Sequence, residues 1–340
     1  MGSVGSFLAS FSESFQAALV IWPFLSFVLT LPILAYLYHR DGRLRFSSAL
    51  VAYLSVLYMA GLACFTLYPL PSGDSGLGIT YGVEPQLNLL GFVADIAKDE
   101  LKALFQILFN VLLFLPLGFI AKRFLRRGFL FTVMLSLAVT CLIETAQLTG
   151  LFGIYPYAYR IFDVDDILFN TLGGVVGWLC GSLLDRFLPE RTLDTPEITN
   201  APGFVRRCVA FGIDMSFLAF FAWGPWILLD LVSEIFFHVP FALPGMDANQ
   251  SEATMVLCCF AVSFVLIEII LPWRCGGSTF GGRIVRMTFE TKQRTGWKRA
   301  LFYALRALFF LAVFVLPAYL IPFVLIFYLV ARKMPYDLLI

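Results

Sequence analysis

The sequence has few charged residues for its length. Of 340 residues, 24 are Lys or Arg and 23 are Asp or Glu, so charged residues make up 14% of the chain, whereas 60% are hydrophobic. A soluble domain is about 25% charged, and this smaller fraction could not cover the surface of a folded chain of this size. The composition therefore excludes a soluble globular protein and predicts an integral membrane protein.

Histidine is also scarce, and cysteine shows no pattern of pairing. His39 and His238 are the two histidines, and neither has a second His or Cys in range, so we predict no metal site and no cofactor. The seven Cys are an odd number, and none lies in a segment expected outside the cell, so no disulfide framework is expected. A net charge of +1 without a basic face excludes nucleic acid as a main partner.

Long apolar runs are what the sequence has in abundance. A helix needs about 20 apolar residues to cross a bilayer, and seven runs satisfy this: Ala17 to Tyr38, Phe46 to Leu70, Ala103 to Ala121, Gly128 to Ile154, Ile167 to Leu184, Cys208 to Leu229 and Ala253 to Trp273. An eighth stretch, 307–331, is interrupted by Pro317 and Pro322. The predicted fold class is all-α, a polytopic helical membrane protein with seven clear spans and a Pro-broken eighth segment that is a span or a re-entrant hairpin.

Basic residues are concentrated in alternate connecting segments. The segments after the first, third, fifth and seventh runs are rich in Arg and Lys, whereas the others hold only Lys98, Lys102 and Arg160. Because basic loops stay in the cytoplasm, we expect a multi-pass protein of the cell membrane with its N-terminus outside. Arg332 and Lys333, directly after the eighth stretch, favour a hairpin with the C-terminus in the cytoplasm.

A polar stretch rich in Pro and acids divides the chain between Leu188 and Gly203. It predicts a five-helix membrane domain at 1–188, a cytoplasmic linker at 189–202 and a second membrane domain at 203–340. Within the second domain, a Gly-rich segment is followed by the β-prone run Ile284 to Glu290, for which we expect a compact turn with a short hairpin.

Polar residues near the expected outer ends of the third to fifth spans form the first candidate site. Ionisable groups inside spans cost several kcal/mol unless they face a partner or water, and here Glu144 and Gln147 lie three residues apart on one helix face. Asp165 is expected to point away from Asp163 and Asp166. We predict a ligand-binding pocket open to the outer leaflet, formed by Asn110, Glu144, Gln147, Arg160, Asp163, Asp166 and Asn170. In the alternative, these groups only join helices.

A second set of buried charges gathers near the expected cytoplasmic face. Arg207 and Asp214 lie seven residues apart on one helix stripe, Glu268 lies near the inner end of the seventh run, and Arg306 lies in the first turns of the eighth. A hairpin in the eighth segment would bring Asp337 to the same level. We predict an inner ion-pair cluster of Arg207, Asp214, Glu268, Arg306 and Asp337, for which a purely structural role is the alternative.

Three segments of the first domain together resemble the VanZ-like family of bacterial membrane proteins. They are FNVLLFLPLGF at 109–119, IETAQ at 143–147 and RIFDVDDILFNTLGGVVGW at 160–178, and PQLNLLGF at 85–92 resembles a weaker motif of the family. The resemblance implies an association with low-level resistance to the glycopeptide antibiotic teicoplanin, without a settled reaction.

The second domain resembles an RDD domain. The resemblance rests on APGFVRRCVAFGID at 201–214, STFGGRIVRMTF at 278–289 and YDLL at 336–339. Arg207, Asp214 and Asp337 take the positions of the Arg and two Asp that give the family its name. For some RDD proteins the resemblance implies cation/proton exchange.

These observations lead to two main hypotheses of function. The first is a bacterial membrane protein that binds or handles an amphiphile at the outer leaflet, so that its partner is a membrane lipid, a lipid-linked envelope precursor or a lipoglycopeptide antibiotic. The second is a cation/proton exchanger that uses Glu144, Asp214 and Glu268 as carriers. A scaffold without a ligand is a third, and both catalysis and the oligomeric state stay open.

Overall fold

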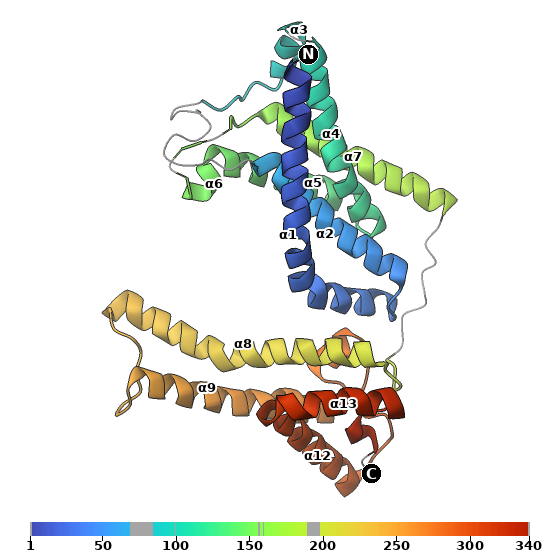
Figure 1. Cartoon of the computed structure of the whole chain (residues 1–340), viewed down its shortest axis with the longest axis vertical. Helices are drawn as coiled ribbons and strands as arrows, with labels where there is room; N and C mark the ends of the chain where they lie inside the picture. The colour runs from blue at the N-terminus through green and yellow to red at the C-terminus, as the bar shows by residue number, and fades with distance from the viewer. Residues whose placement is uncertain are drawn as a thin grey trace. The chain divides into compact units, whose positions relative to one another are not determined.

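The part of the chain that the structure describes is mostly helical. The computed structural model describes residues 2–68, 84–98, 100–155, 157–158, 160–188 and 198–338. Its elements are α1 (Gly2–Asp41), α2 (Phe46–Leu67), α3 (Gly91–Lys98), α4 (Glu100–Arg123), α5 (Phe129–Leu148), α6 (Gly150–Gly153), α7 (Val164–Phe187), α8 (Phe204–Phe237), α9 (Ala248–Phe264), the π-helix η1 (Val265–Ile270), α10 (Leu271–Arg274), α11 (Phe280–Ile284), α12 (Gly296–Val315), α13 (Pro317–Ala331) and the 3₁₀-helix η2 (Pro335–Leu338) (Figure 1). In these residues β-structure is limited to two isolated bridges.

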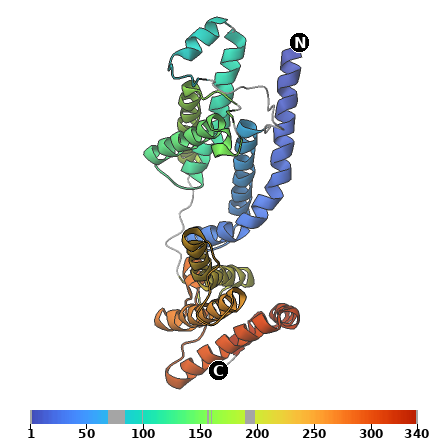
Figure 2. The same cartoon turned by 90° about the vertical axis from the view of Figure 1, so that its left-hand side faces the viewer.

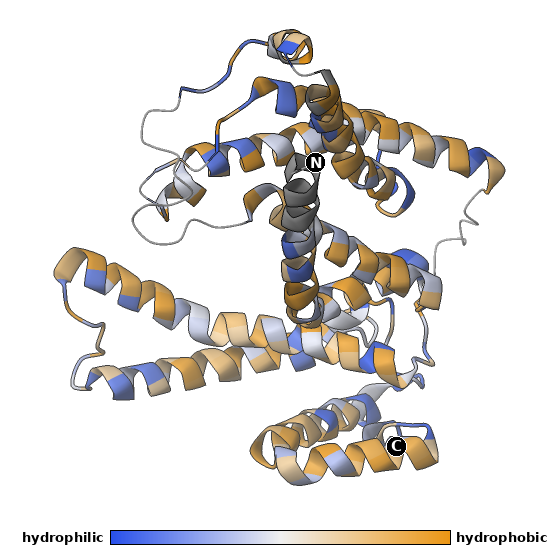
Figure 3. Ribbon diagram, turned by 45° about the horizontal axis from the view of Figure 1, so that its top comes forward, coloured by the Kyte–Doolittle hydropathy of each residue, from blue (hydrophilic) through white to orange (hydrophobic). Residues whose placement is uncertain are grey.

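Seven helical segments are long and apolar enough to cross a membrane. They are Ser12–Asp41, Phe46–Leu67, Ala103–Arg123, Phe129–Leu148, Val164–Phe187, Phe204–Phe237 and Ala248–Arg274. Hydrophobic residues cover most of the length of these helices (Figure 3). The prediction of an all-α polytopic membrane protein is confirmed.

Two local predictions are wrong. The fourth apolar run does not continue as one helix to Ile154, because α5 ends at Leu148 and Gly150, Leu151 and Phe152 all have positive φ angles. The β-prone run after the Gly-rich segment forms no hairpin either. Its first residue ends α11, and Met287 makes only an isolated parallel bridge with Thr199.

The chain forms two compact units. The first unit comprises Met1–Leu29 and Phe46–Thr192, and the second comprises Thr30–Arg45 and Leu193–Ile340. The last part of α1 therefore packs with the second unit, although it precedes α2 in the sequence.

In the first unit, α1 and α2 lie side by side (Figure 2), with Ala18 buried against Ala60 and Cys64. The Trp22 indole donates a hydrogen bond to the carbonyl of Tyr53 at 3.0 Å. Small residues at this contact allow the two helix backbones to approach each other closely.

Glycines create an even closer contact between α4 and α7. A Cβ atom added to Gly118 would lie 1.9 Å from the Gly174 carbonyl oxygen, and one added to Gly177 would lie 1.9 Å from that of Leu115. Only residues without side chains permit this separation, so the closely spaced glycines of α7 serve helix packing. The close contact also brings Asn110 of α4 next to Asp166 of α7.

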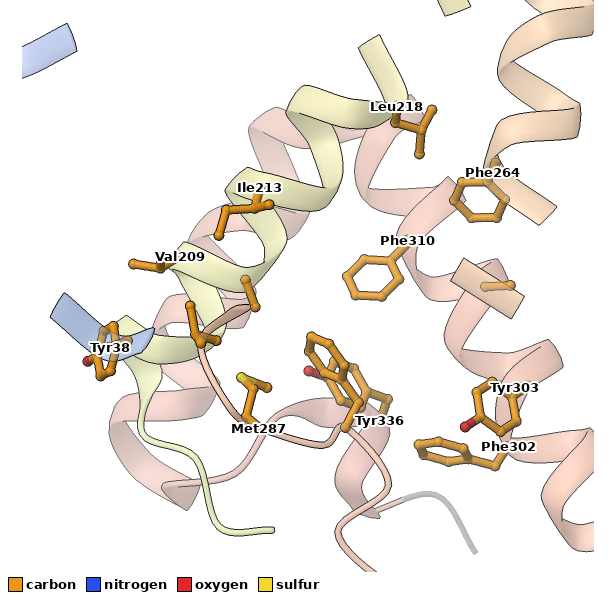
Figure 4. Close-up of a cluster of buried hydrophobic side chains, with 14 residues drawn as sticks. Tyr38, Val209, Ile213, Leu218, Phe264, Met287, Phe302, Tyr303, Phe310 and Tyr336 are labelled. Carbon is orange, nitrogen blue, oxygen red and sulfur yellow. The ribbon is translucent and has the colours of Figure 1, made fainter. Parts of the chain in front are cut away.

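The second unit has an aromatic core (Figure 4). The helices α8 and α9 run side by side (Figure 1). Residues from the end of α1, from α8, α9 and α12, and from the loop after α11 meet in one buried cluster: Tyr38, Val209, Ala210, Ile213, Leu218, Phe264, Val285, Met287, Phe289, Phe302, Tyr303, Ala307, Phe310 and Tyr336. The Gly-rich segment is part of this core, because a Cβ atom on Gly281 would lie 2.1 Å from the Ala210 carbonyl oxygen.

The eighth apolar segment is broken in the middle. The helix α12 ends at Val315, Leu316 has non-helical dihedral angles, and α13 begins at Pro317, which cannot donate the hydrogen bond that a continuous helix needs. After α13 the chain returns to the core, where Tyr336 contacts the rings of Phe309 and Phe310. The break therefore separates two short helices. The apolar part of α12, after its charged first turn, and the whole of α13 are each too short for a standard membrane span.

Candidate functional site

The first candidate site is a small acidic pocket in the first unit. It has a volume of about 20 Å³ and is lined by Phe92, Ala103, Gln106, Ile107, Asn110, Asp163, Asp165, Asp166 and Phe169. We call this set of residues the acidic pocket. A cavity needs about 10–15 Å³ to hold one water molecule, so the pocket admits a single group of that size.

Neutral donors hold the acids of this pocket. The Asn110 side-chain amide donates a hydrogen bond to Asp166 Oδ1 at 2.5 Å, and Gln106 also bonds this carboxylate. The backbone N–H of Asp165 donates to Asp163 Oδ1 at 2.8 Å, which caps the N-terminus of α7. The helix start therefore places three carboxylates in a short run, and helix α4 supplies amides opposite them.

Asp165 has a larger role than its predicted orientation implied. Its side chain does not point away from Asp163 and Asp166. It is buried and lines the acidic pocket with them, and its Oδ2 accepts hydrogen bonds from the backbone N–H of Phe92 at 2.8 Å and from the Gln86 amide at 3.1 Å. Gln86 also forms a parallel bridge with Asp163, which holds the segment before α3 against the start of α7.

The remaining residues predicted for this pocket lie beside it or between helices. Glu144 is buried and accepts a hydrogen bond from the Asp163 N–H at 3.0 Å, and Arg160 is close enough to interact electrostatically with its carboxylate. The Gln147 amide donates to the Thr66 carbonyl at 2.7 Å, so it joins α5 to α2. The Asn170 amide donates to the Thr140 hydroxyl at 3.0 Å, so it joins α7 to α5. Of the seven predicted residues, Asn110, Asp163 and Asp166 line the pocket.

Some residues of this site were missed at the level of the sequence. Asp165, Gln106 and Gln86 bond pocket groups, and Thr140 and Thr66 accept from the two interhelical amides. Gln86 belongs to the PQLN motif, which carried a usable signal. In contrast, a Thr in an apolar run is too common to identify the partner of a buried amide.

The second candidate site is the ion-pair cluster of the second unit, defined as Arg207, Asp214, Glu268, Arg306 and Asp337. All five side chains are buried. Arg306 pairs with Glu268 at 2.8 Å and also donates to the Glu268 carbonyl at 3.0 Å. The Arg306 guanidinium also lies 4.4 Å from the centroid of the Phe289 ring and 4.7 Å from that of Phe310.

Arg207 of α8 makes the second ion pair of the cluster, with a residue of η2 that follows the eighth segment. It pairs with Asp337 at 2.9 Å and donates to the Tyr336 hydroxyl at 3.1 Å. Burial raises the pKa of the Tyr336 phenol, so this hydroxyl stays protonated and neutral. The structure thus brings Asp337 to Arg207.

Asp214 differs from the other two acids of the cluster. Its oxygens accept hydrogen bonds from the Thr279 hydroxyl at 2.6 Å and from the Gly281 N–H at 2.7 Å. Thr279 caps α11, so the Gly-rich segment supplies neutral donors to this carboxylate. Asp214 is therefore bonded to residues of the Gly-rich segment. The sequence pattern predicts a turn for this segment but assigns it no function.

A π-helix presents Glu268 to Arg306. The segment Val265–Ile270 has π-helical hydrogen bonding within an otherwise α-helical span, and Glu268 lies in its middle. Such bulges are frequently found at functional sites. Among the described residues, Glu268 Oε1 and Arg306 Nε have no hydrogen-bond partner, although both atoms are buried.

Comparisons with known proteins divide the chain in two. Residues 55–185 match the model of the VanZ/LLP1 family, and residues 201–340 match the model of the RDD family. Comparison with curated proteins and with solved structures gives no match. The acidic pocket lies in the first matched range, as do Gln147 of α5 and Asn170 of α7, whose amides join helices. The ion-pair cluster lies in the second matched range. The chain is therefore a multi-pass membrane protein in which a VanZ-like region is fused to an RDD region.

Proposed function

We propose that the acidic pocket binds the polar head of a membrane amphiphile at the outer leaflet. The observation that carries this proposal is the position of hydrogen-bonding acids directly beside lipid-facing apolar residues. Asn110 and Asp166 supply the polar side, and Phe92, Ile107 and Phe169 supply apolar walls. An amphiphile joins the same two kinds of surface in one molecule.

The helices on either side of the pocket have apolar faces that are available to lipid. Leu104, Phe105 and Leu108 of α4 are about half exposed, as are Leu168 and Leu172 of α7. A soluble pocket would not be flanked in this way, because such a surface would be in water. An acyl or polyprenyl chain could therefore lie along α4 or α7 while its head group reaches Asp166.

The chemistry of the pocket favours a head group that donates hydrogen bonds. Within the described part of the chain, its lining contains three carboxylates and no Lys or Arg, so a phosphate would be repelled. An ammonium or hydroxyl group would instead be attracted by the acids and by the side-chain carbonyl oxygens of Gln106 and Asn110. The volume of about 20 Å³ limits this contact to one such group. Lipid-linked envelope precursors with amine-bearing head groups and lipoglycopeptide antibiotics with amino groups both satisfy these requirements.

Growth tests with matched variants address this proposal. Cells that produce the full chain are challenged with an acylated glycopeptide and with a glycopeptide that lacks the acyl chain. We expect Asp166→Asn to lower tolerance of the acylated compound and to leave tolerance of the other unchanged. Asp214→Asn is the control, because it removes a buried acid from the second unit. Equal effects of the two variants, or no effect of either on the acylated compound, would contradict the proposal.

A second candidate function is cation/proton exchange in the second unit, and the count of charges in the ion-pair cluster favours it. The cluster has two guanidiniums and three carboxylates, and the two ion pairs leave Asp214 with neutral donors only. Uptake of a proton or a monovalent cation would balance the remaining negative charge inside the membrane.

Salt and alkali tolerance separates this candidate from the first. Under cation/proton exchange, Asp214→Asn lowers growth in high salt at alkaline pH, whereas Asp166→Asn does not. If only salt tolerance changes among all these tests, the amphiphile proposal is wrong and the exchanger is favoured.

A further inference from the structure

A second cavity, in the second unit, belongs to neither candidate site. It has a volume of about 280 Å³ and is lined by Tyr38, Arg43, Leu44, Thr199, Ala201, Pro202, Gly203 and Arg206. We call this set of residues the arginine cavity. Its volume is near the lower end of the about 300–1,000 Å³ typical of sites for small organic molecules.

The lining of the arginine cavity is positively charged. Of the residues that the structure describes, the lining contains two guanidiniums and no acid. In the part of the chain that the structure describes, neither Arg43 nor Arg206 forms an ion pair, and the nearby Asp41 is bonded to Arg40 at 2.7 Å. Among the described residues, the two positive charges of the cavity are therefore not neutralised by an ion pair.

Arg206 is held in a fixed position at this cavity. Its guanidinium donates to the carbonyl oxygens of Gly42 and Arg286, and it stacks 4.8 Å from the centroid of the Tyr38 ring. A guanidinium has five N–H donors, so donors remain for a ligand after these contacts. Because the backbone contacts fix the side chain, a ligand would not have to order it, which favours binding.

The start of α8 adds to the positive character. Gly203 is its N-cap, and no side chain there accepts a hydrogen bond from the first turn of this 34-residue helix. The unsatisfied N–H groups of a helix start attract anions. Together with the two guanidiniums and the hydroxyls of Tyr38 and Thr199, they form a lining suited to phosphate oxygens.

The position of the cavity indicates which phosphate compound it binds. One span ends at Asp41 and another starts at Phe204, so the cavity lies where two spans meet the membrane surface. Exposed apolar side chains accompany it, with 40% of Leu44, 46% of Val205 and 61% of Ile198 accessible. The distribution of basic loops predicts the cytoplasmic side, and basic pockets between spans on this side suit anionic lipid head groups.

We propose that the arginine cavity binds the phosphodiester head of an anionic phospholipid of the inner leaflet. Arg43 and Arg206 contact the phosphate oxygens, and the lipid chains run along the apolar side chains next to the cavity. This site is independent of the acidic pocket, which has the opposite charge and belongs to the first unit.

Native mass spectrometry of the full chain in detergent tests this proposal. The protein is titrated with phosphatidylglycerol and, separately, with phosphatidylcholine. We expect preferential retention of phosphatidylglycerol, and we expect Arg43→Gln to weaken it about fivefold, since one basic residue near an anionic lipid contributes about that factor. Arg43 is exposed, so this variant should fold.

Two further variants make the result specific to the cavity. Arg274→Gln removes another exposed arginine at the end of a span, but one that does not line the cavity, so it should leave retention unchanged. Ala201→Phe fills the cavity without a change in charge, so it should reduce retention of phosphatidylglycerol. Thermal unfolding in phosphatidylcholine confirms that all three variants are folded.

The results that would overturn the proposal are equally defined. Equal retention of both lipids, equal effects of Arg43→Gln and Arg274→Gln, or full retention by Ala201→Phe would each show that no head-group site exists here. Stabilisation by inorganic phosphate alone that matches stabilisation by phosphatidylglycerol would show a site for a free anion and would overturn the assignment to lipid.

Discussion

The two units bury their acids in different ways. In the first unit, Asp165 and Asp166 accept hydrogen bonds from amides and backbone N–H groups, whereas in the second unit Glu268 and Asp337 pair with guanidiniums. A neutral donor can be exchanged for a ligand group at little cost, but removal of one member of a buried ion pair leaves the other charge unpaired. The first arrangement suits reversible binding, and the second suits a fixed structure.

Asp214 is the informative exception, because it lies in the second unit and yet follows the pattern of the first. Its partners are a hydroxyl and a backbone N–H. The way in which an acid is buried therefore does not depend only on the unit in which it lies. Of the three acids in the ion-pair cluster, Asp214 is the one whose charge can change with the least disturbance of the ion pairs.

The largest effect is expected when the buried ion pair is broken. Arg306→Gln leaves Glu268 without its cation, which should lower the free energy of unfolding by about 3–5 kcal/mol, as measured by thermal unfolding in detergent. The matched control on the same helix is Arg299→Gln, whose guanidinium pairs with Glu290 at 3.1 Å but is partly exposed, so about 1 kcal/mol or less is expected.

The double variant Glu268→Gln with Arg306→Gln sharpens this test. It removes both charges, so it should be more stable than Arg306→Gln alone. If the double variant is less stable than either single one, the pair is not the source of the effect and the contrast between the units is lost.

The next largest effect concerns the contact between α4 and α7 in the first unit. Gly177→Ala would place a Cβ atom 1.9 Å from the Leu115 carbonyl oxygen, so the helices must separate at a cost of about 1–3 kcal/mol. Gly128→Ala is the control, since nothing lies within 4 Å of its added Cβ. Because the same contact positions Asn110 and Asp166, Gly177→Ala should also abolish the growth phenotype assigned to the acidic pocket; similar melting temperatures for the two variants would disprove this coupling.

The smallest difference is expected between two residues near the acidic pocket. Asp165→Ala leaves the Phe92 N–H without its acceptor, which should cost about 1–3 kcal/mol, whereas Arg160 is only half-buried and its loss should cost less. This order reverses the expectation that follows from an outward-pointing Asp165. Thermal unfolding of the two alanine variants measures this order. A greater loss of stability with Arg160→Ala than with Asp165→Ala would favour an Asp165 side chain that points away from the pocket.

The architecture could be predicted from the sequence because the membrane requires long apolar helices. Seven runs with few charges allow little other than helices that span a bilayer. The hairpin predicted after the Gly-rich segment failed because its apolar residues, including Met287 and Phe289, pack into the core of the second unit as an irregular loop. Core packing overrode local β propensity there.

Individual partners were harder to predict than the sets they belong to. The five residues of the ion-pair cluster could be named because ionisable groups in apolar runs are conspicuous. Their pairing could not, since it depends on the break at Leu316, which returns the chain to Arg207, and on the π-helix, which turns Glu268 toward Arg306. In the first unit, the roles of Asp165 and Gln86 depend on a bridge between segments that lie 77 residues apart.

The pair between Arg207 and Asp337 also has a consequence for biosynthesis. The two residues are separated by 130 positions in the chain, and translation adds about 5–20 residues per second, so Arg207 is added to the chain roughly 6 to 26 s before its partner. During that interval the guanidinium cannot enter the apolar core alone, because an unpaired charge there costs several kcal/mol. We therefore expect the start of α8 to remain at the hydrated membrane surface while α9 is inserted, and the second unit to close around Arg207 as a late event of its assembly.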